Sequence, residues 1–158
     1  MFQRCITFQV IACWVQSGYK PGIHISGPEG PLAMRFVVPV VLVLVALIHA
    51  LPLLGVLGAE QVARLYGISA PEPDVELLLR HRAVLFGLLA AFLAYAAVRP
   101  ALHRAALAAG FVSVVSFLVL SHLVGPYNSA LATVVRVDWI ALALLVAGAV
   151  AHALKREE

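Results

Sequence analysis

The chain has 158 residues, of which 63% are hydrophobic and 12% are charged, and its formal net charge is +3. Soluble domains carry about 25% charged residues, and a soluble helix bundle needs a polar face on every helix. The composition therefore excludes an ordinary soluble domain. The basic residues sit at the ends of long apolar runs and form no basic stripe with interleaved aromatic residues, which argues against nucleic acid as a partner.

Residues 1–33 differ from everything that follows, and we interpret them as an N-terminal leader. Their apolar stretch, Cys5–Val15, is too short to span a membrane, and no small-residue cleavage site follows it. Cys5 and Cys13 match neither a zinc-site nor a C-x-x-C spacing, so we interpret them as incidental thiols. We expect the leader to be poorly ordered or to lie on the membrane surface, and our hypothesis is that Met34 is the true initiator.

The first long apolar run predicts a helix over about residues 36–57. Pro39 falls in its first turn, where the missing N–H leaves the hydrogen-bond ladder intact. Pro52, near the far end, leaves the carbonyl of Ile48 without its usual N–H donor. We therefore expect the helix to bend or end at Pro52.

The three remaining apolar runs predict three more helices. The second covers about residues 73–98 and begins at Pro73, a favoured first-turn residue, with acidic side chains that complement the helix dipole. The third covers residues 105–124 and ends at Gly125, because glycine followed by proline is a common C-terminal stop. The fourth covers about residues 129–154 and ends before a basic pair.

These runs predict an all-α protein, a bundle of four transmembrane helices formed by residues 34–158. A bilayer core of ~30 Å needs about 20 apolar residues per helix, a length that each run reaches or approaches. Four spans place both termini on one side, and the positive-inside rule favours the cytoplasm for that side by five basic residues to four. We therefore expect a multi-pass protein of a bacterial inner membrane, with the lipid bilayer as its main partner. The basic residues on the terminal side are Arg35, Arg99, Arg104, Lys155 and Arg156, and those on the other side are Arg64, Arg80, Arg82 and Arg136.

The predicted topology gathers polar residues of all four helices at one end of the bundle, opposite the termini. Charged side chains at such depth are costly unless they are paired or reach the headgroup region. This cluster therefore holds the candidate ligand-binding residues. They are His49 in the first helix, Arg80, His81 and Arg82 in the second, His122 in the third, and Arg136 and Asp138 in the fourth.

Two interpretations of this cluster stay open. In the first, the residues lie at headgroup level and only anchor the helices. In the second, they line a pocket that opens toward the outer face, whose positive character suits an anionic headgroup, a carboxylate or a quinone carbonyl. Glu76 and Arg80 have the i,i+4 spacing of a helical ion pair, and we expect Arg82 to pair with Asp138 across helices.

The histidines of the cluster raise an alternative function. His49 and His122 are expected at comparable depth on two parallel helices, a geometry that can ligate haem across a bundle. The alternative is thus a redox-associated membrane subunit that binds haem or quinone. A small dimeric transporter is a third possibility, with Asp138 as its nearest candidate for a carboxylate within a helix. We identify no catalytic residues and no metal site, and expect no cofactor outside the haem or quinone alternative.

A family resemblance is carried by four segments, Val38–Leu44 leading to His49, Leu65–Ile68, Leu79–Gly87 and Gly110–Phe117. Over about residues 34–154 the chain resembles small bacterial four-helix membrane proteins that are broadly similar to the DoxX-like families. Some of these carry the label phosphopantetheine adenylyltransferase, a soluble α/β enzyme with an H-x-G-H motif and a phosphate cradle that this chain lacks. We therefore expect a non-enzymatic membrane protein or accessory subunit, which acts as a homo-oligomer or with a membrane partner subunit.

Overall fold

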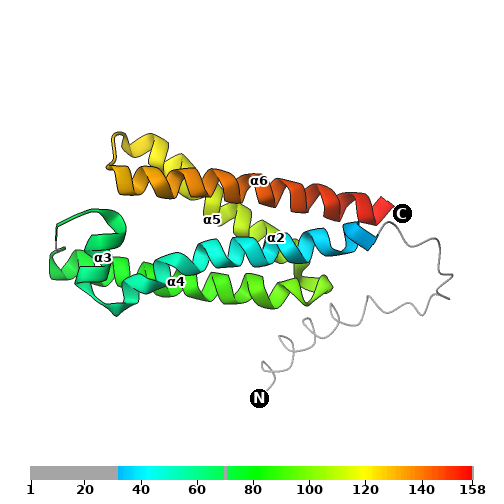
Figure 1. Cartoon of the computed structure of the whole chain (residues 1–158), viewed down its shortest axis with the longest axis horizontal. Coiled ribbons are helices and arrows are strands. Elements are labelled where there is room, and N and C mark those ends of the chain that lie inside the picture. Colours follow the sequence, from blue (N-terminus) through cyan, green and yellow to red (C-terminus); the bar gives the residue numbers. More distant parts are fainter. Residues whose placement is uncertain (1–31, 70, 158) are drawn as a thin grey trace, which may run out of the picture.

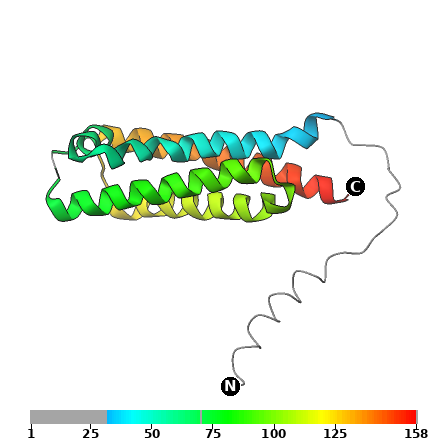
Figure 2. The same ribbon diagram turned by 90° about the horizontal axis from the view of Figure 1, so that it is seen from below.

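The computed structural model describes residues 32–69 and 71–157, and these residues form helices joined by short connections, without strands. Four long helices lie side by side (Figures 1 and 2). The predicted all-α fold with four long helices is confirmed, whereas the predicted leader over residues 1–33 lies outside the described residues except for the two that begin the first helix. The elements are α2 (Leu32–Ala50), η1 (Leu51–Leu57), α3 (Ala59–Tyr66), α4 (Pro73–Ala97), η2 (Pro100–Leu102), α5 (His103–Val124) and α6 (Ser129–Glu157).

The outer surface of the bundle is apolar. Four stretches are long and apolar enough to cross a membrane, and large side chains such as Leu77 and Val112 are 69% and 70% exposed. Such a surface is unfavourable in water but is solvated by lipid tails, and helices satisfy their own backbone hydrogen bonds there. The protein is therefore a multi-pass membrane protein. The four stretches are Phe36–Leu57, Pro73–Ala97, Pro100–Val124 and Ser129–Lys155.

The helix ends follow the proline and glycine positions of the sequence. α2 ends at Ala50, and the chain continues as the 3₁₀ segment η1, with Pro52 at its start, so the expected interruption at this proline is confirmed. Pro73 is the first residue of α4, as predicted. α5 ends at Val124, and the capping residue Gly125 has a positive φ of 89°, which glycine adopts without steric cost. The start of α2 and the end of α6 lie at one end of the bundle, and α3 lies at the other (Figure 1).

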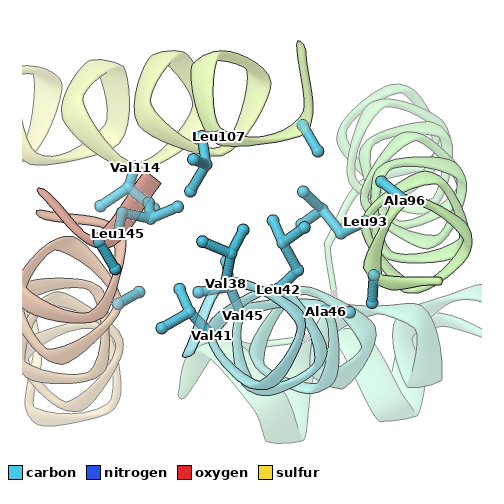
Figure 3. Close-up of a cluster of buried hydrophobic side chains, with 14 residues drawn as sticks. Val38, Val41, Leu42, Val45, Ala46, Leu93, Ala96, Leu107, Val114 and Leu145 are labelled. Atoms are coloured by element: carbon cyan, nitrogen blue, oxygen red, sulfur yellow. The ribbon is translucent and has the colours of Figure 1, made fainter. Parts of the chain in front are cut away.

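The core lies between α2 and the three other long helices (Figure 3). Val38, Leu42 and Val45 recur at i, i+4 and i+7 along α2 and share one helix face, as core residues of a helix must. α2 packs most extensively against α4 and α6. Small side chains let the helices approach closely, because lipid tails give large apolar side chains no reason to prefer protein. The buried alanines of the core are Ala46, Ala96, Ala97, Ala106, Ala141 and Ala151.

Gly148 marks a close approach of three helices. A Cβ atom at this position of α6 would lie 3.0 Å from Cγ1 of Val41 in α2 and 3.2 Å from Cδ2 of Leu107 in α5. The neighbouring Ala147 is exposed. The glycine is thus required by packing and not by backbone conformation, since its φ is helical.

We predict that Gly148→Val lowers the free energy of unfolding in detergent by about 1–3 kcal/mol, because its added methyl groups overpack the contact with Val41 and Leu107. Ala147→Val, which places the same side chain on the lipid face, is the matched control and should change stability by a few tenths of a kcal/mol. Helix propensity alone would make Gly148→Val stabilising, so a rise in thermal stability would contradict the packing argument.

The short helix α3 was not predicted from the sequence, and Asn128 ties it to α6. The Nδ2 of Asn128 donates to the carbonyl oxygens of Tyr66 at 2.7 Å and Gly67 at 3.1 Å, where α3 ends. Its Oδ1 accepts from the backbone N–H of Leu131 at 2.9 Å and so caps α6. One side chain therefore closes two helix ends and holds α3 against the bundle.

Variants of Asn128 separate these two functions. Asn128→Asp keeps the capping oxygen but removes the N–H donors, so hydrogen exchange in α3 should rise while the first turn of α6 stays protected. Asn128→Ala removes both and should cost about 1–2 kcal/mol of stability. Hydrogen–deuterium exchange resolved to peptides of α3 and α6 measures the difference. Wild-type protection of α3 in the Asp variant would contradict the tether.

Candidate functional site

Arg82 lies among three aromatic rings inside the bundle. Its guanidinium carbon is 5.5 Å from the ring centre of Tyr66, 5.1 Å from that of Phe86 and 5.5 Å from that of Phe117. These rings belong to α3, α4 and α5, so three elements meet at one cation. Each ring attracts the cation through its quadrupole, a contribution of about 0.5–2 kcal/mol that grows as water is excluded.

The rings do not meet the hydrogen-bonding requirement of Arg82. A guanidinium has five N–H donors, and no hydrogen bond or ion pair joins it to another residue of the part of the chain that the structure describes. Arg82 is the tenth residue of α4, within a membrane-spanning stretch. Its guanidinium lines the two cavities that lie beside it, and Asp138 attracts it electrostatically from one of them.

The first cavity, which we call the serine cavity, has a volume of about 510 Å³ and lies between α4, α5 and α6. Among the described residues, Arg82 is the one charged residue in its lining. Three serines lie on the α5 side, and leucine, valine and phenylalanine form most of the remaining wall. The lining residues are Arg82, Phe86, Ser113, Ser116, Phe117, Leu120, Ser121, Val124, Tyr127, Leu131 and Val135.

The second cavity, which we call the aspartate cavity, has a volume of about 240 Å³ and lies on the other side of Arg82 and Phe86. Asp138 of α6, His49 of α2 and Tyr66 of α3 contribute polar groups to it. The Tyr66 hydroxyl is buried and has no hydrogen-bond partner within residues 32–69 and 71–157. An unpaired buried hydroxyl is costly, and Tyr66 is the lining residue of this cavity that carries one.

His49 joins two helices and lies between the two cavities. It is 3% exposed; its Nδ1 is 2.9 Å from the carbonyl oxygen of Val45, and its Nε2 is 3.1 Å from Oγ of Ser113 in α5. Because a carbonyl can only accept, Nδ1 carries the hydrogen, and in the neutral ring Nε2 accepts from the Ser113 hydroxyl. His49 lines the aspartate cavity and Ser113 the serine cavity, so this hydrogen bond is part of the wall between them.

The residues do not fit a haem held by His49 and His122. Both ring nitrogens of His49 are already within hydrogen-bond distance of protein oxygens. His122 lies nine residues beyond Ser113 on α5, which is ~13 Å along the helix axis. A shared iron would need both imidazoles at one point.

Three of the seven predicted ligand-binding residues come together. His49, Arg82 and Asp138 line the aspartate cavity. The expected Arg82–Asp138 pair is not closed to a contact within 4.0 Å, but the two groups attract each other electrostatically across this cavity. The expected Glu76–Arg80 pair is confirmed at 3.0 Å. The other four residues lie outside both cavities: Arg80 and His81 in a shallow depression beside Val56 and Val84, His122 on α5 and Arg136 on α6.

Sequence analysis missed the aromatic and serine residues of the site. Phe86 lies four residues after Arg82, and Phe117 lies four residues after Ser113, so each pair occupies one helix face. The sequence signal for Tyr66 is limited to its i,i+4 spacing from Val62 and the glycine that follows it. The structure shows that both side chains are buried in α3 and that Gly67 has a left-handed φ of 62°. A second pair was also missed: His103 and His152 meet edge to face at 6.3 Å at the opposite end of the bundle.

Comparisons of the chain with protein-family models, curated proteins and solved structures find no match. The resemblance to DoxX-like proteins therefore stays a prediction. Functional conclusions rest on the chemistry of the site, because a fold of four helices by itself implies no activity.

We predict that Ser113→Ala lowers the free energy of unfolding by about 1–3 kcal/mol, because it leaves the buried Nε2 of His49 without its partner. Ser116→Ala is the matched control, since within the described part of the chain the Ser116 hydroxyl bonds only back to the carbonyl oxygen of Ser113 on its own helix. Chemical unfolding in detergent measures both variants. Equal stability of the two would show that the His49–Ser113 hydrogen bond does not link α2 to α5.

Proposed function

We propose that this protein is a membrane-embedded binding protein for an anionic amphiphile, whose charged group is held by Arg82. One observation carries the proposal: a guanidinium within a membrane-spanning stretch is surrounded by three rings and has no acidic partner within ion-pair distance among the described residues. Asp138 attracts this cation from the aspartate cavity without touching it. A cation at such a place without a directly bonded acidic group is costly and is a marker of function. An anionic oxygen in the adjacent cavity would supply both the counter-charge and the missing hydrogen-bond acceptors.

The serine cavity is the better place for this ligand. Its described lining contains no acidic side chain, so an anion meets attraction from Arg82 without repulsion. Leu120 and Val124 of its lining are 57% and 79% exposed on α5, so an apolar tail leaving the cavity would enter lipid and not water. A volume of about 510 Å³ is within the range of small-molecule sites. Charge and solvent thus favour an amphiphile over a fully water-soluble anion.

The aspartate cavity favours a second candidate function, the binding of a quinone headgroup. The buried Tyr66 hydroxyl and the Arg82 guanidinium offer donors for a quinone carbonyl, and Asp138 offers an acceptor for a quinol hydroxyl. Phe86 and His49 supply flat side chains in the same wall, with ring centres 5.6 Å apart. Of the redox alternative, this candidate retains quinone binding but not a haem ligated by His49 and His122.

The cellular setting in this proposal follows the sequence. The distribution of basic residues supports both termini in the cytoplasm of a bacterial inner membrane, and the exposed apolar faces of the helices leave room for a homo-oligomer or a membrane partner subunit. A small dimeric transporter is the third possibility, because Asp138 supplies a half-buried carboxylate within a membrane-spanning stretch. Membership of the DoxX-like group is part of the same proposal.

The test compares two arginines of the same helix. Arg82→Gln should lower the retention of anionic amphiphiles on the purified protein by roughly 10- to 100-fold, because a charge-assisted hydrogen bond contributes about 1.5–3 kcal/mol. Arg80→Gln removes the same charge from an exposed position paired with Glu76 and should leave retention unchanged. Native mass spectrometry of protein released from membranes measures both.

Equal retention by wild type and Arg82→Gln would overturn the proposal. Quinone found on the wild type and lost in Tyr66→Phe, with no anionic amphiphile present, would replace it with the second candidate.

A further inference from the structure

The serines of the serine cavity offer hydrogen-bond acceptors. The Ser116 hydroxyl donates to the carbonyl oxygen of Ser113 at 2.9 Å, and the Ser121 hydroxyl donates to that of Leu118 at 2.8 Å. Ser113 donates to the neutral His49 ring. Each serine hydrogen is thus committed to a protein atom, while the lone pairs of each Oγ remain open to a donor from the cavity.

The serine cavity is therefore polar in two different ways. Arg82 supplies only donors, together with a positive charge, and Ser113, Ser116 and Ser121 supply acceptors along one side of the cavity. A ligand that satisfies both needs an anionic acceptor group and, next to it, neutral groups that donate. A simple carboxylate or a sulfate has no hydrogen to offer the serines.

Resting on the proposed function, we infer that the ligand is an anionic lipid whose phosphodiester also carries free hydroxyl groups, as in phosphatidylglycerol. The phosphate oxygens accept from Arg82, and the headgroup hydroxyls donate to the Oγ atoms of Ser116 and Ser121. The acyl chains leave past Leu120 and Val124 into the bilayer.

The charge of the cavity discriminates against zwitterionic lipids. An ammonium headgroup could also donate to the serines, but it would be desolvated without an acidic partner, because Asp138 lines the other cavity and not this one. Within the described lining of the serine cavity, a ligand charge of −1 balances Arg82, whereas a zwitterion also brings an ammonium group that finds no acidic side chain there. Hydroxyls meet the serines without adding charge.

The extent of the serine cavity along α5 strengthens this selectivity. The lining reaches from Tyr127, beyond the end of α5, to Ser113, eleven residues before the last residue of α5, which is ~16 Å along the axis. A headgroup drawn into the cavity leaves water and loses its hydration. Only a headgroup whose polar atoms all find partners there is retained against the bulk bilayer.

The experiment places the full-length protein in nanodiscs that contain equal amounts of phosphatidylglycerol and phosphatidylethanol, with phosphatidylethanolamine as the third lipid. Phosphatidylethanol carries the same single charge and phosphodiester but no headgroup hydroxyl. Native mass spectrometry of released protein should show phosphatidylglycerol enriched over phosphatidylethanol by roughly 5- to 10-fold, the effect of one or two hydrogen bonds. Phosphatidylethanolamine should be retained least.

Variants assign the preference to the serines. Ser116→Ala combined with Ser121→Ala should bring phosphatidylglycerol down to the level of phosphatidylethanol and leave phosphatidylethanol unchanged. Ser129→Ala, exposed at the start of α6, is the control. Alanine favours helix more than serine does, so folding is preserved, and Ser116→Ala alone should give part of the loss.

The outcomes separate the two proposals. Equal retention of both anionic lipids, lost together in Arg82→Gln, would overturn the hydroxyl preference and leave the proposed function standing. Retention that does not depend on Arg82 would overturn the proposed function itself. If soluble glycerol 3-phosphate at equal concentration displaced the lipid, the inference that the ligand is a lipid would be overturned. If phosphatidylethanolamine were retained as well as phosphatidylglycerol, the charge argument would be overturned.

Discussion

Hydrocarbon as the solvent is the constraint on which the rest of the structure depends. No water is available within a bilayer core to satisfy backbone N–H and C=O groups, so each spanning segment has to close its own hydrogen bonds as a helix. In the same solvent, exposing apolar side chains costs no free energy, which is why side chains such as Leu77 face outward. Helix association then depends on close packing at small residues and on a few polar links, such as His49 with Ser113 and Asn128 with the end of α3.

Arg82 is the departure from this arrangement that carries the proposed function. Three aromatic rings and the nearby Asp138 lower the cost of its charge in hydrocarbon, but aromatic rings cannot replace oxygen acceptors for five N–H donors. The position of Arg82 between two cavities divides the site chemically. In the described structure one side has serine oxygens and no acid, and the other has Asp138 and the unpaired hydroxyl of Tyr66. A single cation therefore faces two environments that suit different headgroups.

The long helices followed from local sequence features, and the short one did not. The interruption at Pro52, the start at Pro73 and the stop at Gly125 act through the residue's own backbone, so each was predictable. α3 has only eight residues and is more polar than the long helices, and its stability comes from burial of Val62 and Tyr66 and from Asn128, which is far away in sequence. Short helices owe their existence to such tertiary contacts.

The sequence by itself determined that the helices lie in a lipid bilayer, which segments span it, and at which end of the bundle the polar residues gather. It could do so because hydropathy and turn residues act locally. Only the tertiary structure decided that Arg82 and Asp138 share a cavity without pairing, that Arg80 and His122 lie outside it, and which rings and serines complete the site. The reason is rotational: residues one or two positions apart on a helix face different directions, and the orientation of each helix about its axis is set by packing against its neighbours.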